Sequence, residues 1–125
     1  MTIAQLINHS IAAKSEKRRH HRLSVRLPIE YFLIESSCPR LGYTVDVSEG
    51  GLLMHVPEKL RVGQNLKIKF YYASASRIDY IQALGEVIRV DSLGKSGKEY
   101  KCAVKFVDLP CGILKQLQNF LKSLS

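Results

Sequence analysis

The 125-residue chain lacks the features that mark several common protein classes. Its three cysteines, Cys38, Cys102 and Cys111, are odd in number and show no C-x-x-C spacing, so neither a disulfide framework nor a zinc site is expected. No segment approaches the ~20 apolar residues of a transmembrane helix. Residues 1–17 lack the basic start and unbroken apolar centre of a signal peptide. These absences predict a soluble, cytoplasmic protein without membrane insertion.

Acidic residues are scarce as well. The chain has 11 Asp and Glu against 19 Lys and Arg, which gives a formal net charge of +8. Six of the basic residues and a single Glu fall within residues 14–26. Such an excess favours phosphate, nucleic acid or another anionic partner. We therefore expect an anionic ligand to dock at this segment.

The length of the chain suits one domain with one core. We expect an N-terminal segment at residues 1–15 and a single domain at residues 16–125. Residues 2–16 place apolar side chains at helical spacing, which predicts a short N-terminal helix. Such a helix packs on its own domain or docks on a partner, and the sequence leaves both open.

Alternation of apolar and polar residues predicts a mainly β protein. Residues 23–33 alternate throughout, with Pro28 on the exposed face, where it suits an edge or a bulge. Further strands are expected at residues 43–48, 51–56, 65–72, 81–90 and 100–106. In the fourth of the six strands, Leu66, Ile68, Phe70 and Tyr72 face inward. Six short antiparallel strands hide their edges best by closing into a small barrel.

The end of the chain changes to a helical pattern. Asp108 is expected to cap a helix that has Pro110 in its first turn. The apolar stripe of this helix contains Ile113, Leu114, Leu117, Phe120, Leu121 and Leu124. The expected fold is therefore an all-β core, a six-stranded antiparallel β-barrel, with a C-terminal α-helix lying across it.

Two motifs carry the chemistry. Arg18 and Arg22 form R-x-x-x-R, and Asp46, Ser48 and Gly51 form D-x-S-x-x-G. Because consecutive strands are usually neighbours, the two motifs should meet on the outer side of the barrel wall.

The alternation in residues 43–48 predicts which side chains face outward there. The expected inward set is Tyr43, Val45 and Val47, and the expected outward set is Thr44, Asp46 and Ser48.

With the two motifs in this order on six strands and a helix, the chain resembles the PilZ domain family of bacterial cyclic di-GMP receptors. The resemblance covers roughly residues 16–124 and includes the GEVIRV and YKCAVKFVDL stretches. The family fold, a six-stranded antiparallel barrel with a C-terminal helix, agrees with the pattern of residues.

The resemblance assigns Arg18 and Arg22 to ligand binding, with Arg19 as an additional contact. A guanidinium can bind phosphate oxygens in pairs, read a guanine edge or stack on a base. Lys17 precedes the arginine motif. In the family a cation there accompanies an intercalated ligand dimer and an apolar residue accompanies a single ligand, so Lys17 favours the dimer.

The second motif is expected to read the base. Asp46 would accept hydrogen bonds from the guanine N–H donors, and Ser48 would orient that carboxylate or bind the ligand. Gly51, helped by Gly50, would adopt a positive φ and let the ligand approach the backbone closely.

Two other functions remain open. A small basic barrel with exposed aromatic residues such as Tyr71 can bind single-stranded nucleic acid. Some PilZ relatives instead act as adaptors through protein contacts, independently of nucleotide. The leading hypothesis is a receptor whose basic arm becomes ordered on cyclic di-GMP and signals to an unidentified protein effector.

The sequence gives no support for an enzyme or a metal site. No nucleophile motif is present, and Ser48 lies in no G-x-S-x-G context. His20 and His21 are adjacent, so on a strand they would point to opposite sides, and no carboxylate or cysteine lies at ligand spacing. His55 is expected to be an ordinary surface residue.

Overall fold

The computed structural model of the chain describes residues 22–95 and 97–124. Several predictions concern residues outside these ranges. They are the ligand contacts Lys17, Arg18 and Arg19, the N-terminal helix, and the pair of His20 and His21. The described part contains one helix and seven strands. They are β1 Leu23–Ser24, β2 Pro28–Leu33, β3 Arg40–Val47, β4 Gly51–Val56, β5 Asn65–Ser74, β6 Arg77–Ser92, β7 Tyr100–Asp108 and α2 Cys111–Ser123.

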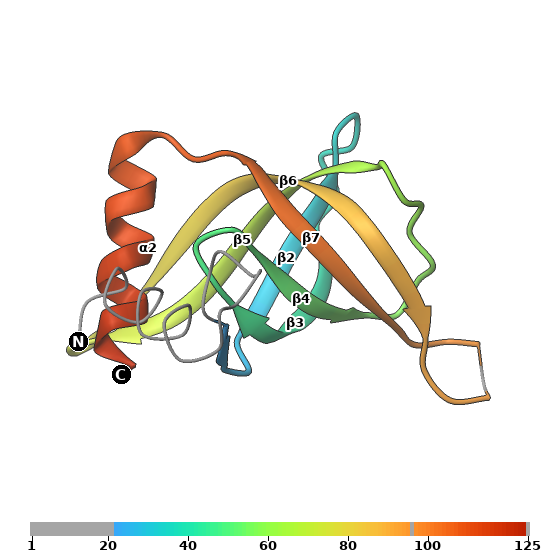
Figure 1. Cartoon of the computed structure of the whole chain (residues 1–125), viewed down its shortest axis with the longest axis horizontal. Coiled ribbons are helices and arrows are strands. Elements are labelled where there is room, and N and C mark those ends of the chain that lie inside the picture. Colours follow the sequence, from blue (N-terminus) through green and yellow to red (C-terminus); the bar gives the residue numbers. More distant parts are fainter. Residues whose placement is uncertain (1–21, 96, 125) are drawn as a thin grey trace, which may run out of the picture.

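Six of the strands form a closed antiparallel barrel (Figure 1). The order of the sheet is β1-β3-β2-β5-β6-β7-β4, and pairing of β3 with β4 closes it. The short β1 is an extra strand, which pairs with β3 beyond the end of β2. The predicted six-stranded barrel with a C-terminal helix is therefore confirmed.

The first predicted strand, residues 23–33, is interrupted in the structure. Ser24 lies opposite Asp46 and Pro28 opposite Tyr43, so residues 25–27 face only two residues of β3. Such an extra residue is a β-bulge, which Pro28 favours because it has no N–H to donate to a ladder.

The hydroxyl of Thr44 fills this bulge. It donates a hydrogen bond to the carbonyl oxygen of Val25 and accepts one from the backbone N–H of Leu27 at 2.9 Å. The side chain of Thr44 thus satisfies backbone groups that lost their partners where the ladder shifts.

A second irregularity, between β3 and β4, follows Thr44. As a result Thr44 is 1% exposed and Val47 is fully buried, whereas Val45 is partly exposed. The predicted inward position is therefore wrong for Tyr43 and Val45 and confirmed for Val47. An extra residue in a strand changes the face on which the neighbouring side chains lie.

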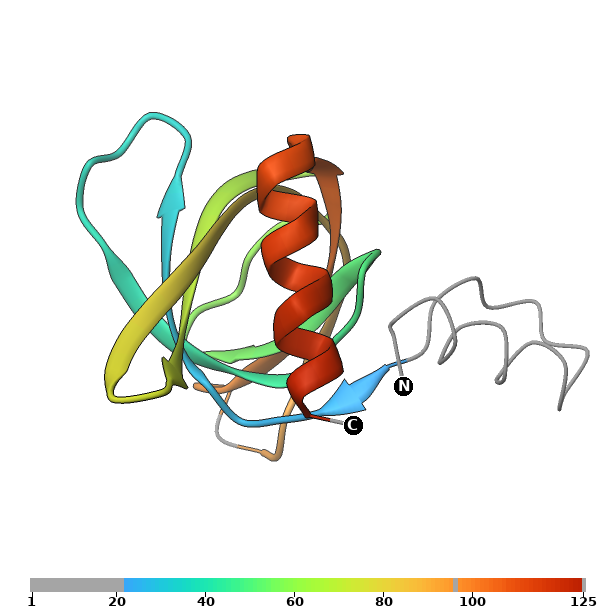
Figure 2. The ribbon, with the colours of Figure 1, turned by 90° about the vertical axis from the view of Figure 1, so that its left-hand side faces the viewer.

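The core contains most of the predicted inward residues of β5 and most of the predicted apolar stripe of α2, whereas Tyr72 is partly buried and Leu124 is 44% exposed. Leu66, Ile68 and Phe70 are fully buried. Leu117, Phe120 and Leu121 of α2 are buried. Figure 2 shows that α2 lies across one end of the barrel. The Phe120 ring lies 4.6 Å from the ring of Tyr72 and 6.1 Å from that of Phe70, measured between centroids.

The helix begins later than predicted. Asp108 is the last residue of β7 and pairs with Leu84, whereas Pro110 is the N-cap of α2 and makes no side-chain cap bond. The expected Asp108 cap is therefore wrong. Among the described residues, no helix combines the length and the apolar character needed to cross a membrane.

The cysteines give a test of the core. Burial raises the pKa of the Cys102 thiol to about 11, with smaller contributions from Asp91 and Glu58, whereas Cys38 and Cys111 are exposed and free. A raised pKa keeps the thiol protonated and unreactive at pH 8. We predict that iodoacetamide at this pH modifies Cys38 and Cys111 in the folded protein and Cys102 only after denaturation. Peptide mass spectrometry checks this, and equal rates at all three cysteines would contradict the fold.

The bulge gives a second test. Thr44→Val keeps the shape of the side chain but leaves the N–H of Leu27 without its acceptor, so we expect a loss of about 1–3 kcal/mol in the free energy of unfolding. Thr44→Ser keeps the hydroxyl and serves as the control. Urea unfolding followed by circular dichroism measures both, and a Val variant at least as stable as the Ser variant would contradict this role of the hydroxyl.

Candidate ligand-binding site

An ion pair joins the two sequence motifs. Nη1 of Arg22 lies 2.6 Å from Oδ1 of Asp46, and the two side chains are 31% and 16% exposed. Arg22 stands just before β1, and the register of β1 with β3 places Ser24 opposite Asp46. The structure thus brings together one residue of each predicted motif, while Arg18 lies outside the described residues.

The described residues use only part of the hydrogen-bonding capacity of the Arg22–Asp46 pair. A guanidinium has five N–H donors and a carboxylate has about four acceptor sites. Within residues 22–95 and 97–124 the pair uses one donor and one acceptor, and both side chains still contact solvent. A partly exposed pair of this kind contributes roughly 1 kcal/mol or less to stability. Its two members can therefore bind a ligand at little cost to the fold.

Ser48 faces the interior, not the solvent. It is 2% exposed, its N–H donates to the carbonyl oxygen of Gly51 at 2.8 Å, and its hydroxyl accepts from the N–H of Gly50 at 3.2 Å. The hydroxyl also donates to the Gly51 oxygen at 3.2 Å. The prediction that Ser48 shares an outward face with Asp46 is wrong. Instead, Ser48 shapes the turn that leads from β3 to β4.

Gly51 is required for a different reason than predicted. Within the described residues, the glycines with positive φ are Gly63, Gly94 and Gly97, so the expected positive φ of Gly51 is wrong. A Cβ atom at Gly51 would lie 2.0 Å from the carbonyl oxygen of Val104. A glycine here lets β4 approach β7 closely.

The turn is tied to the rest of the molecule on two sides. Gly50 accepts a hydrogen bond from the N–H of Phe106 at 2.8 Å, and Nε2 of Gln118 on α2 donates to Glu49 at 2.8 Å. The position of the D-x-S-x-x-G turn is thus linked to both β7 and the C-terminal helix.

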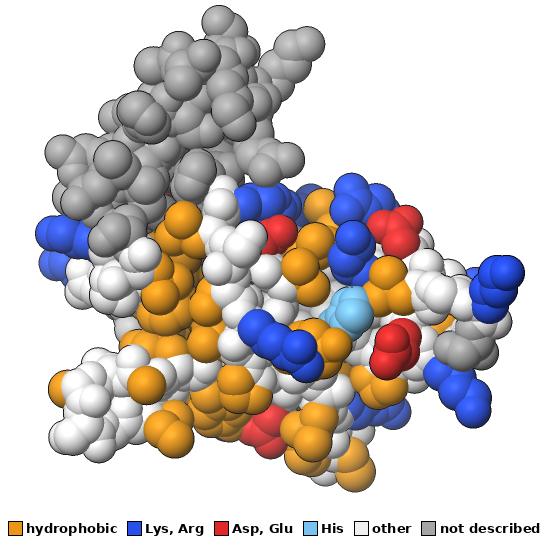
Figure 3. All heavy atoms as spheres, turned by 90° about the horizontal axis from the view of Figure 1, so that it is seen from below, with side chains coloured by type: hydrophobic (Ala, Val, Ile, Leu, Met, Phe, Trp, Pro, Cys, Tyr) orange, Lys and Arg blue, Asp and Glu red, His pale blue; other side chains and the backbone are white. Residues whose placement is uncertain are grey.

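Beside Asp46, the outer face of β3 holds an aromatic cluster that the sequence did not indicate. Tyr43 Oη and His55 Nδ1 share a hydrogen bond of 2.6 Å, and Cζ of Arg26 lies 4.0 Å from the centre of the Tyr43 ring. His55 is thus part of a cluster and not an ordinary surface residue. The incorrect alternation in β3 concealed this cluster because it placed Tyr43 inside. In Figure 3, a histidine lies among apolar groups, with Lys and Arg side chains above it and to its left and an acidic side chain to its lower right.

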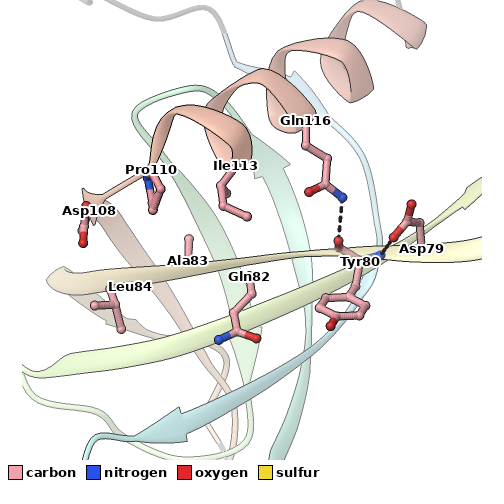
Figure 4. Close-up of a pocket in the computed structure, with 9 residues that line it drawn as sticks. All are labelled: Asp79, Tyr80, Gln82, Ala83, Leu84, Asp108, Pro110, Ile113 and Gln116. Atoms are coloured by element: carbon pink, nitrogen blue, oxygen red, sulfur yellow. Dashed lines mark hydrogen bonds between the residues drawn. The ribbon is translucent and has the colours of Figure 1, made fainter.

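A cavity of about 530 Å³ lies elsewhere, between β6 and the start of α2 (Figure 4). Its carboxylates, Asp79 and Asp108, make it unsuited to an anion, and Gln116 crosses it to donate to the carbonyl oxygen of Tyr80 at 2.7 Å. It contains none of the motif residues. In residues 22–95 and 97–124, no group of three or more His, Cys, Asp or Glu side chains could hold a metal ion.

Solved structures of low sequence identity share this fold. The Bacillus subtilis inhibitor of motility MotI/DgrA is 16% identical with a TM-score of 0.70, and the match covers 84% of this chain and 49% of that chain. The chain thus spans about half of that protein. The PilZ domain of YcgR from Escherichia coli, solved with c-di-GMP, is 15% identical with a TM-score of 0.69, covering 87% and 92%.

A third structure is PlzA from Borreliella burgdorferi in complex with c-di-GMP. It is 16% identical with a TM-score of 0.59, and the match covers 95% of this chain and 57% of that chain. A comparison with curated proteins gives no sequence match. The sequence profile of the PilZ domain matches residues 16–123. With the closed barrel, the C-terminal helix and this match over most of its length, the chain belongs to the PilZ domain family.

Proposed function

We propose that this protein is a cyclic di-GMP receptor and acts by binding and not as an enzyme. The observation that carries the proposal is the Arg22–Asp46 ion pair, which joins the R-x-x-x-R and D-x-S-x-x-G motifs at one place on the barrel. Membership of the PilZ family supports it, as do the c-di-GMP complexes of the YcgR and PlzA structures.

The chemistry of the ligand fits these two side chains. Cyclic di-GMP carries two phosphates and two guanines, so it offers both acceptors and donors. Arg22 would bind a phosphate or the O6 and N7 of guanine, and Asp46 would accept from the guanine N–H groups. Because each holds the other in position before the ligand arrives, little conformational freedom is lost on binding.

The basic arm supplies the switch. Lys17, Arg18 and Arg19 precede Arg22 in the sequence, with His20 and His21 between them. We propose that the ligand binds this arm and the barrel wall together and fixes one against the other. Such a change in order can be recognised by a downstream protein, since it creates a surface that exists only with the ligand bound.

Calorimetric titration with cyclic di-GMP tests the site. The wild-type protein is expected to bind with micromolar or tighter affinity, and Arg22→Ala and Asp46→Ala are each expected to weaken binding at least tenfold, because each removes a charged ligand contact. Cyclic di-AMP and GTP are the ligand controls.

Arg77→Ala is the matched control variant. Arg77 is also an ion-paired arginine, with Nη2 at 4.0 Å from Oδ2 of Asp79, but it lies at the start of β6 in the β5–β6 hairpin. It should bind like wild type. If Arg22→Ala and Asp46→Ala also bound like wild type, the assigned site would be wrong.

The same variants separate the receptor from a nucleic-acid-binding module. A single-stranded oligonucleotide bound through charge alone would bind Asp46→Ala equally well or better, because that variant loses a negative charge. The structure offers Tyr71 little freedom as a stacking surface. Its hydroxyl donates to the carboxylate of Glu30, and its ring packs against that of Tyr80. A nucleotide-independent adaptor would give no heat with any of these ligands.

Lys17 sets the expected stoichiometry. By resemblance to the family, a cation before R-x-x-x-R accompanies a ligand dimer, so titration of the wild type is expected to end near two ligands per chain. Lys17→Leu, with an apolar residue at this position, should shift the end point to one ligand while binding persists. An unchanged end point in this variant would show that Lys17 does not set the stoichiometry.

A further inference from the structure

The outer face of β3 continues from Asp46 toward the start of the strand. Asp46 and Tyr43 are both partly exposed on this face, and Leu41 beyond them is 67% exposed. At ~3.3 Å per residue, about 10 Å of strand separates Tyr43 from Asp46. A ligand held at Asp46 that extends along β3 therefore reaches Tyr43.

Tyr43 is held rigidly at both ends of its side chain. His55 fixes the hydroxyl through the 2.6 Å hydrogen bond, and Arg26 covers the ring at 4.0 Å. A fixed aromatic ring loses little conformational freedom when a base packs on it. Among the described residues the guanidinium of Arg26 has no carboxylate partner, so its N–H donors remain available to a phosphate.

Beside Tyr43 lies a slot of about 290 Å³. Its lining is mostly apolar, with one carboxylate, and comprises Leu41, Gly42, Tyr43, His55, Val56, Pro57 and Glu99. This volume is at the lower end of ligand pockets, so it suits a single base and not a whole dinucleotide. Within the described part of the chain, the carboxylate of Glu99 has no hydrogen-bond or ion-pair partner. It can accept hydrogen bonds from the N–H edge of a guanine.

A second cavity connects this slot with the Arg22–Asp46 pair. It has a volume of about 340 Å³, and its lining is Ser24, Val25, Arg26, Tyr43, Thr44 and Val45. It shares Tyr43 with the slot, and its Ser24 lies opposite Asp46 in the β1–β3 register. The exposed lining of this cavity is mostly apolar, and Arg26 is its one charged side chain. A single guanidinium thus lies between two places that each offer a carboxylate.

From these contacts we infer that the slot is a subsite for the second guanine of the ligand. Asp46 reads one base. The sugar–phosphate ring lies over the connecting cavity, where Arg26 binds a phosphate. The second base packs against Tyr43 and presents its N–H edge to Glu99. This inference rests on the proposed cyclic di-GMP binding, and it adds Arg26, Tyr43 and Glu99 to the contacts.

The test is calorimetric titration of the full chain with cyclic di-GMP. Tyr43→Ala and Glu99→Gln are each expected to raise Kd about tenfold, because one removes the packing surface and the other an anionic acceptor. Tyr43→Phe keeps the ring and should stay within about threefold of wild type. This rescue separates packing on the base from a merely structural role of the hydroxyl.

Two matched variants control for general effects. Tyr80→Ala removes another tyrosine whose ring contacts a cation, with Nζ of Lys69 at 5.0 Å from the ring centre. Tyr80 lies on β6, away from Asp46. Glu35→Gln removes an exposed carboxylate in the turn between β2 and β3. Both are expected to bind like wild type, and equal losses in these controls would overturn the subsite.

The outcomes distinguish the subsite from the proposed function. The subsite is wrong if cyclic di-GMP binds to the wild type and not to Arg22→Ala, while Tyr43→Ala and Glu99→Gln both bind it within about twofold of wild type. The proposed receptor function would hold in that case. If the wild type itself does not bind cyclic di-GMP, the proposed function and the subsite both fall. Glu99→Gln changes an exposed residue, so the test holds even where Tyr43→Ala fails to fold.

Discussion

The structure depends on how β3 is paired along both of its edges. One edge carries β1 and then β2, and the other carries β4, which closes the barrel. The strand accommodates all three partners because the ladder shifts on both edges near Thr44, whose hydroxyl satisfies the backbone of the bulge. These shifts place Thr44 inside and leave both Tyr43 and Asp46 on the outer surface. A strand with strict alternation could not present both.

The overall fold could be predicted because each strand of the barrel carries its own local signal. Leu66, Ile68 and Phe70 alternate with polar residues without interruption, and the stripe of α2 has helical spacing, so the sequence alone predicts that both belong to the core. The incorrect predictions concern residues whose positions depend on contacts between segments far apart in the sequence. The inward position of Ser48 follows from the bulge in β3, and the need for Gly51 follows from the carbonyl of Val104 more than 50 residues away.

The candidate site could be predicted only in part for the same reason. The two motifs predict Arg22 and Asp46 as site residues, because a guanidinium and a carboxylate at such positions mainly form ion pairs or bind a ligand. Nothing in the local sequence marked Tyr43 or Glu99, the residues of the proposed subsite. They line one cavity because the register of β3 with β4 places Tyr43 opposite His55, and Glu99 lies just before β7. A bulge at a functional site is thus both a structural device and the point at which prediction from periodicity fails.

Nitrogen–proton correlation spectra, recorded during a titration with cyclic di-GMP, locate the surface on which a cyclic dinucleotide binds. If it binds on the outer face of β3, the largest changes in amide signals fall on residues 16–26 and 43–46 and near Glu99, with little change on the β5–β6 hairpin. Changes confined to β5, β6 and the cavity beside α2, or no changes at all, would show that the ligand does not bind on this face.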